Sequence, residues 1–230
     1  ETCEPLWRFM PDDTTFYTKG ARKFQAQNDS TGLADAMVAA IVSEELSDDR
    51  AAFIATRDFF FLATVNSEGA PTVSYKGGAP GFVKVVSPKK LAFPNYDGNG
   101  MFLSMGNMDE TSNVGLLFID FETPHRLRVQ GHASVSSDHG KLEMFPGANL
   151  IVEIDITSCF VNCARYIHKH VRTQDSEYVP DEAGNQPYPS WKRIDGFQPV
   201  LPAKDQGLAE QSGGLISAEQ YGELLSKGES

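Results

Sequence analysis

The feature that most constrains the fold is a succession of short apolar runs between residues 59 and 135. FFFLATV at 59–65 is followed, after Asn-Ser-Glu-Gly, by PTVSYKGG at 71–78. Further runs lie at 82–86, 91–93, 114–121 and 126–135. Apolar runs of four to eight residues divided by Gly, Pro, Asn and Asp are typical of antiparallel strands. The sequence therefore predicts a β-barrel or sandwich.

Alternation is clearest in RLRVQGHASV at 126–135. Strict alternation of apolar and polar residues predicts a strand with one buried face. Leu127, Val129, Gly131, Ala133 and Val135 are expected on one face, and Arg126, Arg128, Gln130, His132 and Ser134 on the other. VGLLFIDF at 114–121 is apolar on both sides, which predicts a central strand or one covered at an interface.

The remaining elements follow from local signals. LIVEIDI at 150–156 alternates and predicts a strand, 158–167 favours a short helix or turn, and 168–174 is expected to form the last strand. Helical spacing predicts a helix over 33–46 and a second one, capped by Ser47 or Asp48, that runs to about residue 57. Ser217 and Gln220 form a capping-box pattern before a helix at 218–227. Residues 1–28 and 178–202 are expected to be irregular.

The charge balance excludes some partners. The 230-residue chain has a formal net charge of −11, which disfavours nonspecific binding to nucleic acid or an anionic membrane surface. No apolar run approaches the roughly 20 residues of a membrane helix, and no signal peptide is visible, so we expect a cytoplasmic protein. The three cysteines are too few for a disulfide framework and are expected to be buried thiols. Cys159 and Cys163 would share one face if their segment were helical.

The order of these segments resembles the pyridoxamine 5'-phosphate oxidase-like family of FMN-binding split barrels. The resemblance is carried by FFFLATVNSEGAP, SYKGG, FPNYDGNG, LLFIDF and RLRVQGHASV, and spans residues 52–172. It implies a mainly β fold with peripheral helices, built on a six-stranded antiparallel split barrel, and a homodimer with FMN at the subunit interface. The expected domains are an N-terminal extension with helices at 1–51, the barrel at 52–176, and a C-terminal loop and short helix at 177–230.

The glycine-rich loop YDGNG at 96–100 is the candidate phosphate site. Two glycines let the backbone approach an anion, and a helix beginning near residue 100 would direct its first amides at the phosphate. Asn99, Gly100, Met101 and Ser104 are the candidate contacts. A plain turn before a helix is the alternative interpretation, because DGNG is also common turn chemistry.

The loop departs from the resembled oxidases in one respect. Those enzymes carry a Ser-Arg-Lys run that grips the phosphate, whereas Asn99-Gly100-Met101 stands here. The resemblance makes Arg126 and Arg128 the nearest candidates for the missing cations, and a solvated strand face is the alternative.

The resemblance also places the end of the second strand along the flavin. Lys76 is the candidate catalytic residue, because it corresponds in position to a lysine near the flavin ring and the substrate. The other candidate contacts to the cofactor are Ser74, Tyr75, Gly77, Phe93, Asn95 and Tyr96. Trp191 and Arg193 are added because a C-terminal Trp and Arg complete the neighbouring subunit's site in the resembled oxidases. An exposed lysine and ordinary core aromatics are the alternatives.

No metal site is predicted, because His168 and His170 lack a third ligand. No Ser-His-Asp signature, P-loop or GxGxxG motif is present, which disfavours hydrolases, NTPases and Rossmann enzymes. The resemblance implies an FMN-dependent oxidoreductase that transfers a hydride through flavin N5 to or from a small molecule. The alternatives are a flavin- or haem-binding module without turnover, and a deazaflavin- or nicotinamide-linked reductase on the same barrel.

Overall fold

The computed structural model describes residues 16–229. The chain divides into two compact units, the first ending at Arg172 and the second beginning at Thr173. No helix within the described range is both long enough and apolar enough to cross a membrane.

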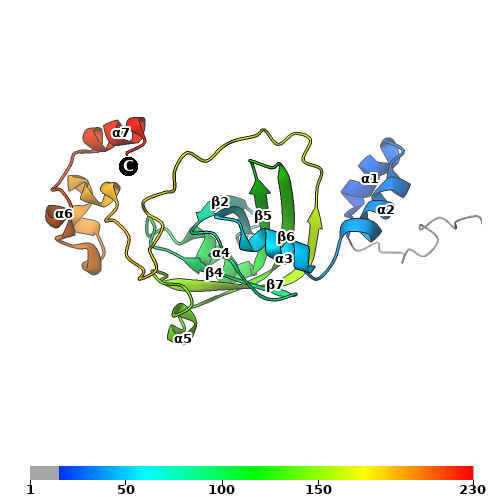
Figure 1. Cartoon of the computed structure of the whole chain (residues 1–230), viewed down its shortest axis with the longest axis horizontal. Helices are drawn as coiled ribbons and strands as arrows, with labels where there is room; N and C mark the ends of the chain where they lie inside the picture. Colours follow the sequence, from blue (N-terminus) through cyan, green and yellow to red (C-terminus); the bar gives the residue numbers. More distant parts are fainter. Residues whose placement is uncertain (1–15, 230) are drawn as a thin grey trace, which may run out of the picture. The chain divides into compact units, whose positions relative to one another are not determined.

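One antiparallel sheet dominates the first unit (Figure 1). Its seven strands, within residues 16–229, follow the order β2-β1-β5-β6-β7-β4-β3. They are β1 Phe59–Val65, β2 Pro71–Gly77, β3 Lys84–Ser87, β4 Lys90–Asn95, β5 Asn113–Asp120, β6 His125–Ser136 and β7 Leu150–Val161. The expected mainly β split barrel with peripheral helices is confirmed, but with seven strands instead of six. The prediction that 114–121 is a central strand is confirmed, because β5 lies between β1 and β6; β2 and β3 form the edges of the sheet.

The first hairpin shows how the sequence sets the register. The side-chain oxygen of Asn66 accepts hydrogen bonds from the amides of Glu68 and Ala70, and Gly69 adopts a φ of 84°. This turn places Val65 opposite Pro71 and Phe59 opposite Gly77. Every second side chain of β1 is then buried.

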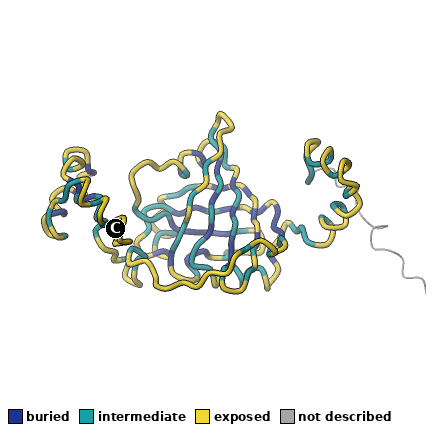
Figure 2. The backbone as a smooth tube through the Cα atoms, turned by 90° about the horizontal axis from the view of Figure 1, so that it is seen from above, coloured by how far each residue is buried: buried dark blue, intermediate teal, exposed yellow. Residues whose placement is uncertain are grey.

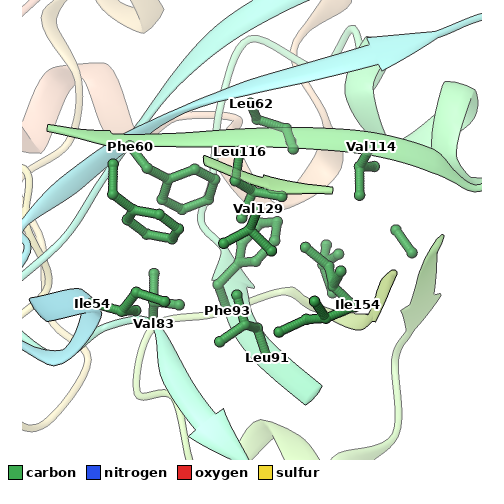
Figure 3. Close-up of a cluster of buried hydrophobic side chains, with 14 of the residues drawn as sticks. Ile54, Phe60, Leu62, Val83, Leu91, Phe93, Val114, Leu116, Val129 and Ile154 are labelled. Carbon is green, nitrogen blue, oxygen red and sulfur yellow. The ribbon is translucent and has the colours of Figure 1, made fainter. Parts of the chain in front are cut away.

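The core lies inside the barrel (Figure 3). Each fully buried Leu, Ile or Phe side chain stabilises the fold by about 1.5–3 kcal/mol. Figure 2 shows the buried positions concentrated along the strands. The largest core side chains that are fully buried include Phe60, Phe93, Phe118, Ile54, Leu62, Leu91, Leu116 and Ile154.

β6 and β7 approach each other closely at a bulge between Gln130 and Gly131. A Cβ at position 131 would lie 2.3 Å from the carbonyl oxygen of Asp155, so only glycine fits there. The predicted alternation of β6 is confirmed, since Leu127, Val129 and Ala133 are buried.

The prediction of a helix or turn over 158–167 is wrong for residues 158–161, because β7 continues to Val161, but a turn follows at 165–166, where the amide of Ile167 donates to the carbonyl oxygen of Ala164. The prediction that both later cysteines are buried is half correct. Cys159 is buried, and its thiol donates to the carbonyl oxygen of Glu45, whereas Cys163 lies beyond the strand and is exposed. Cys3 lies outside the described residues.

The predicted last strand over 168–174 is also wrong, because the segment has no regular secondary structure and does not pair in the sheet. Its one aliphatic residue, Val171, is 79% exposed, so no apolar row packs the segment onto the barrel. Its local contacts include a hydrogen bond from the amide of His170 to the carbonyl oxygen of Phe121, an edge-on contact between the rings of the same two residues, and an ion pair of Arg172 with Asp58.

Three helices precede the barrel: α1 Lys19–Gln27, α2 Thr31–Ile41 and α3 Asp48–Ala55. α1 corrects the expectation of an irregular extension, because the Thr18 side chain caps it by accepting the amide of Ala21. The rest of that prediction, for residues 1–15, lies outside the described residues. The two predicted helices are confirmed as α2 and α3, although α2 ends earlier than expected, and Ser47 caps α3.

α4 Leu103–Thr111 connects β4 to β5, and α5 His139–Leu142 lies between β6 and β7. α4 begins three residues after the predicted start at Gly100.

The second unit is built from short 3₁₀ helices and two α-helices. They are η2 Ser190–Arg193, η3 Asp195–Val200, η4 Ala203–Asp205, α6 Leu208–Gln211 and α7 Ala218–Lys227. The predicted loop over 178–202 is therefore partly helical, since it contains η2 and η3. A buried ion pair between Lys192 and Asp205, with N and O 2.9 Å apart, connects η2 to η4. The predicted capping box of Ser217 and Gln220 is confirmed at the start of α7.

Candidate functional site

A cavity of about 390 Å³ lies between β2 and residues 94–105, which run from the end of β4 into α4. Its size falls within the range of about 300–1,000 Å³ that is usual for small-molecule sites. Because β2 is the edge of the sheet, its outer backbone groups have no neighbouring strand. The cavity is therefore bordered by a strand edge on one side and a helix start on the other.

Alternation along β2 directs Thr72, Ser74 and Lys76 to the same side of the sheet as the buried residues of β1. The Ser74 hydroxyl lies 3.2 Å from the Ser104 hydroxyl on α4, so the two serines join the strand to the helix inside the cavity lining.

Asn107, one turn further along α4, holds the helix in place. Its side chain is buried and its Nδ2 donates to Oγ1 of Thr64 at 2.9 Å and of Thr72 at 3.1 Å. Thr111 at the end of the helix donates to the carbonyl oxygen of Val65. These bonds fix the distance between the start of α4 and β2.

No side chain caps the start of α4. The amides of the first turn have no intrahelical acceptor, and they carry the positive end of the helix dipole. Leu103, Ser104 and Met105 belong to this turn, and all three line the cavity. The preceding residue, Phe102, has a φ of 48°, which is strained for a bulky side chain. Such strain is common at ligand sites.

The charged residues of the lining are Lys76 and Asp97. Burial lowers the pKa of Lys76. Lys76 makes no ion pair with any of the described acidic residues, so its ammonium is available to an anionic ligand. Burial raises the pKa of Tyr96, which therefore stays neutral at physiological pH. For Tyr75, burial and then the charge of Asp58 raise the pKa.

Most of the residues predicted from the sequence meet in this cavity. Its lining includes Ser74, Tyr75, Lys76, Gly77, Asn95, Tyr96, Asn99, Gly100, Met101 and Ser104. Whether they bind a cofactor stays a prediction.

Three predicted contacts lie elsewhere. Phe93 is fully buried in the barrel core because it points inward from β4. Arg126 and Arg128 lie on the outward face of β6 and are not part of the lining. Arg126 donates from Nη2 to the carbonyl oxygen of Cys163 at 2.8 Å. Their role as cations for a bound phosphate stays a prediction.

Trp191 and Arg193 belong to the second unit. Arg193 donates from Nε and Nη2 to the carbonyl oxygens of Gly214 and Gly213, both at 2.8 Å. Trp191 packs edge-on against Phe197. Both side chains thus have structural contacts within their own unit.

The sequence interpretation missed five residues that also line the cavity: Thr72, Val73, Phe102, Leu103 and Met105. Thr72 could have been found from the polar alternation Thr-x-Ser-x-Lys along 72–76. The left-handed conformation of Phe102 has no sequence signal.

An apolar surface adjoins the cavity on the outward side of β2, β1 and β5; we call it the aromatic face. Phe59 stacks between Tyr75 and Phe121, with ring centroids 5.4 and 5.8 Å away. Phe61 lies directly opposite both Tyr75 and Leu117 in the sheet. Tyr75 is 62% exposed, and Val73, which lies two residues earlier on β2 and points to the same side, is 70% exposed. The aromatic face comprises Phe59, Phe61, Val73, Tyr75, Leu117 and Phe121.

Comparison with known proteins gives a family and a fold. The family profile of pyridoxamine 5'-phosphate oxidase matches residues 46–158, about half of the chain. No curated protein matches the chain.

Three of the solved structures that resemble the chain are named for different functions. A candidate pyridoxamine 5'-phosphate oxidase from Lactobacillus delbrueckii is 23% identical, with a TM-score of 0.43 over 51% of this chain and 95% of that one. An FMN-binding protein from Syntrophomonas wolfei is 11% identical, with a TM-score of 0.39 over 62% and 97%. The haem storage protein HutZ from Vibrio cholerae is 19% identical, with a TM-score of 0.37 over 51% and 94%.

The profile match covers α3 and every strand of the sheet, apart from the last residues of β7, and includes the cavity. Through residues 46–158, the chain belongs to the pyridoxamine 5'-phosphate oxidase-like family of split barrels.

Proposed function

We propose that the chain is an FMN-dependent oxidoreductase that holds FMN in the cavity along β2. The observation that carries the proposal is the meeting of three donor groups in one cavity. These groups are the uncapped first turn of α4, the Ser74–Ser104 hydroxyl pair, and the unpaired ammonium of Lys76.

The donor set fits a phosphate. A phosphate monoester carries close to two negative charges at neutral pH and accepts several hydrogen bonds. Helix amides and hydroxyls satisfy such a group without a net positive protein, which explains how an acidic chain can bind an anion. A Cβ at Gly98 or Gly100 would meet no atom within 4 Å, so the loop leaves room beside the helix start.

The rest of the lining fits a planar ring with one polar edge. Pro94, Tyr96 and Met101 supply apolar surface, and the unpaired backbone of β2 supplies donors and acceptors in a row. Such a combination of apolar walls and a few placed polar groups is typical of cofactor sites.

When bound, FMN would supply the hydride chemistry of the reaction. The residues of this chain would bind and orient it and exclude water from one face. Lys76 would hold a positive charge, or a donated hydrogen bond, at the ring edge or at an anionic substrate. No protein nucleophile is needed for this class of reaction.

We also propose that the chain forms a homodimer through the aromatic face. Monomeric proteins rarely expose contiguous apolar patches of stacked rings. A second copy would cover Val73 and Tyr75, and it would lie next to the cavity because Tyr75 belongs to both surfaces.

The cofactor is tested with protein purified without added ligand. Its absorbance spectrum should show the two flavin bands, and mass spectrometry of the released ligand should give the mass of FMN. A Soret band would support haem binding instead. Protein that is colourless and takes up no FMN on titration would refute the proposal.

Paired variants locate the site. Replacing Ser74 and Ser104 together with alanine should weaken FMN binding about tenfold or more, because each hydroxyl would donate to a charged group. Ser134 is an exposed serine on β6 outside the cavity, so Ser134→Ala is the matched control. If the double serine variant and the Ser134→Ala control bind FMN with equal affinity, the two serines do not contact the cofactor.

Turnover is tested separately. Bleaching of the flavin bands by NADH or NADPH under anaerobic conditions, and their return on admission of air, would support an oxidoreductase. A flavin spectrum that neither nicotinamide changes would support a binding protein without this activity.

A further inference from the structure

Three consecutive apolar residues, Met101, Phe102 and Leu103, lie exposed at the mouth of the cavity; we call them the apolar rim. Each of the three side chains is more than half exposed, and all three belong to the cavity lining. Runs of three exposed apolar residues are unfavourable in a water-soluble fold unless they have a function. The apolar rim is separate from the aromatic face, which lies on the outward side of the sheet, so the proposed dimer does not explain it.

Hydrogen bonds fix the backbone of the apolar rim at both of its ends. The amide of Met101 donates to Oδ1 of Asn99 at 3.1 Å. The carbonyl oxygen of Phe102 accepts the amide of Gly106 at 2.8 Å, in the first turn of α4. A molecule that binds here therefore meets a backbone already in place, which lowers the entropy lost on binding.

Phe102 is the residue of the apolar rim that is least suited to its backbone. Among the described residues other than glycine, Asp29, Phe102 and Ser112 have a left-handed φ, of 50°, 48° and 58°. Aspartate is enriched in this region, whereas a bulky side chain is strained there. Burial does not offset the strain, because the ring of Phe102 is exposed and makes no aromatic contact with the described part of the chain. Since such strain persists mainly at functional sites, the exposed ring is a candidate contact for a ligand.

The charges of the lining indicate which ligand the apolar rim can accept. Lys76 and Asp97 are the charged residues of the lining, and their formal charges cancel. The phosphate dianion of FMN already exceeds the single positive charge of Lys76. A second anion would meet no further cation in the lining and would be repelled by Asp97 and by the phosphate. An uncharged molecule would meet no such repulsion.

We propose that the substrate of the oxidoreductase is an uncharged aromatic molecule that packs against the apolar rim, and that Phe102 determines this specificity. Burial of the three side chains would drive binding, and the ring of Phe102 would favour a second aromatic ring in an offset or edge-on arrangement. This inference rests on the proposed binding of FMN, and it assigns Lys76 to the cofactor and not to the substrate.

The first test uses two probes that differ in charge, naphthalene-2-carboxamide and naphthalene-2-carboxylate. Both carry the same pair of fused rings, but only the carboxylate is an anion at neutral pH. Each is titrated into FMN-loaded protein, and the change in the flavin absorbance gives its dissociation constant. The amide should bind at least about tenfold more tightly than the carboxylate. Equal affinities, tighter binding of the carboxylate or no binding of the amide would overturn the proposal.

The second test removes the aromatic ring with Phe102→Gly. Glycine is suited to the left-handed backbone at this position, so the variant should fold. It should bind the amide about ten- to a hundredfold more weakly than the wild type and keep its affinity for FMN within about twofold. Ser112→Gly is the matched control, because Ser112 has a left-handed φ at the other end of α4 and lies outside the cavity lining. The control should change neither affinity.

The outcomes separate this inference from its alternatives. Unchanged affinity of Phe102→Gly for the amide would overturn it. An equal loss of FMN and amide binding would also overturn it, because Phe102 would then hold the cofactor. Light scattering that shows Phe102→Gly to be a monomer and the wild type a dimer would assign the apolar rim to the subunit interface instead. Failure of the wild-type protein to bind FMN would refute the proposed function, and this inference with it.

Discussion

The hydrogen bonds of Asn107 give the sharpest test of how the cavity is held together. Asn107 is 5% exposed and donates to two threonine hydroxyls, Thr64 on β1 and Thr72 on β2. Asn107→Leu keeps the branched shape and the number of heavy atoms of the side chain, and it removes both donors. Each buried hydrogen bond contributes about 0.5–1.5 kcal/mol, so the two together contribute about 1–3 kcal/mol.

The two threonine hydroxyls remain 2.9 Å apart and can still bond to each other, which limits the penalty for leaving them unpaired. We therefore expect a loss of about 2 kcal/mol in the free energy of unfolding. For a domain of 150–250 residues this corresponds to a fall in Tm of about 4–8 °C. FMN binding should also weaken, because α4 would no longer be fixed against β2.

Thermal and urea unfolding, monitored by circular dichroism, measure the stability loss. Asn113→Leu is the matched control, because Asn113 lies exposed at the start of β5 and its side chain makes no hydrogen bond with any of residues 16–229. The control should stay within about 0.5 kcal/mol of the wild type. If both variants are equally stable, the bonds of Asn107 do not hold α4 in place, and the account of the cavity given above is refuted.

Three further outcomes are expected. Gly131→Ala should lower the free energy of unfolding by about 1–3 kcal/mol, since its Cβ would collide with the backbone of Asp155. Gly115→Ala, whose Cβ would lie 3.9 Å from Ala63, is the control in urea unfolding. Equal stabilities of the two variants would contradict the close approach of β6 and β7. Phe93→Ala should cost about 3–5 kcal/mol because it empties a fully buried site, and a loss near zero by the same assay would show that the core is not packed there. Burial lowers the pKa of Lys76 in the folded state. Between that pKa and the higher pKa of the unfolded state, the unfolded chain binds more protons, so the free energy of unfolding rises with pH. Urea unfolding at several pH values should show a smaller rise for Lys76→Met than for the wild type, and identical pH profiles would contradict the burial of Lys76.

Most of the barrel could be predicted because its strands carry their own signals. The alternation of β6 and the apolar β5 follow directly from which faces are buried. The end of β7 could not be predicted, because Ser158 and Cys159 interrupt the pattern while tertiary packing keeps them in the strand. Cys159 is held there by backbone bonds with Ser43, which is more than a hundred residues away in the sequence.

The sequence brought together those residues of the cavity lining that lie close to one another along the chain. The loop from Asn95 to Ser104 and the strand from Ser74 to Gly77 could both be found from local composition. Phe93 could not be separated from them by sequence alone, because the side to which a strand residue points depends on the register. The arginines of β6 could not be placed for a different reason, since nothing local indicates that two strands, β1 and β5, lie between β6 and β2.

The position of β2 at the edge of the sheet has a consequence for the behaviour of the protein without ligand. An edge strand that shows apolar side chains and unpaired backbone groups is a template for pairing with another chain, and natural proteins protect such edges. Val73 and Tyr75 make this edge apolar, and no charged side chain stands between them. An occupant of the cavity would cover the backbone of β2 much as an eighth strand would. We therefore expect the ligand-free protein to aggregate more readily than the loaded one, so that solubility itself becomes a measure of occupancy.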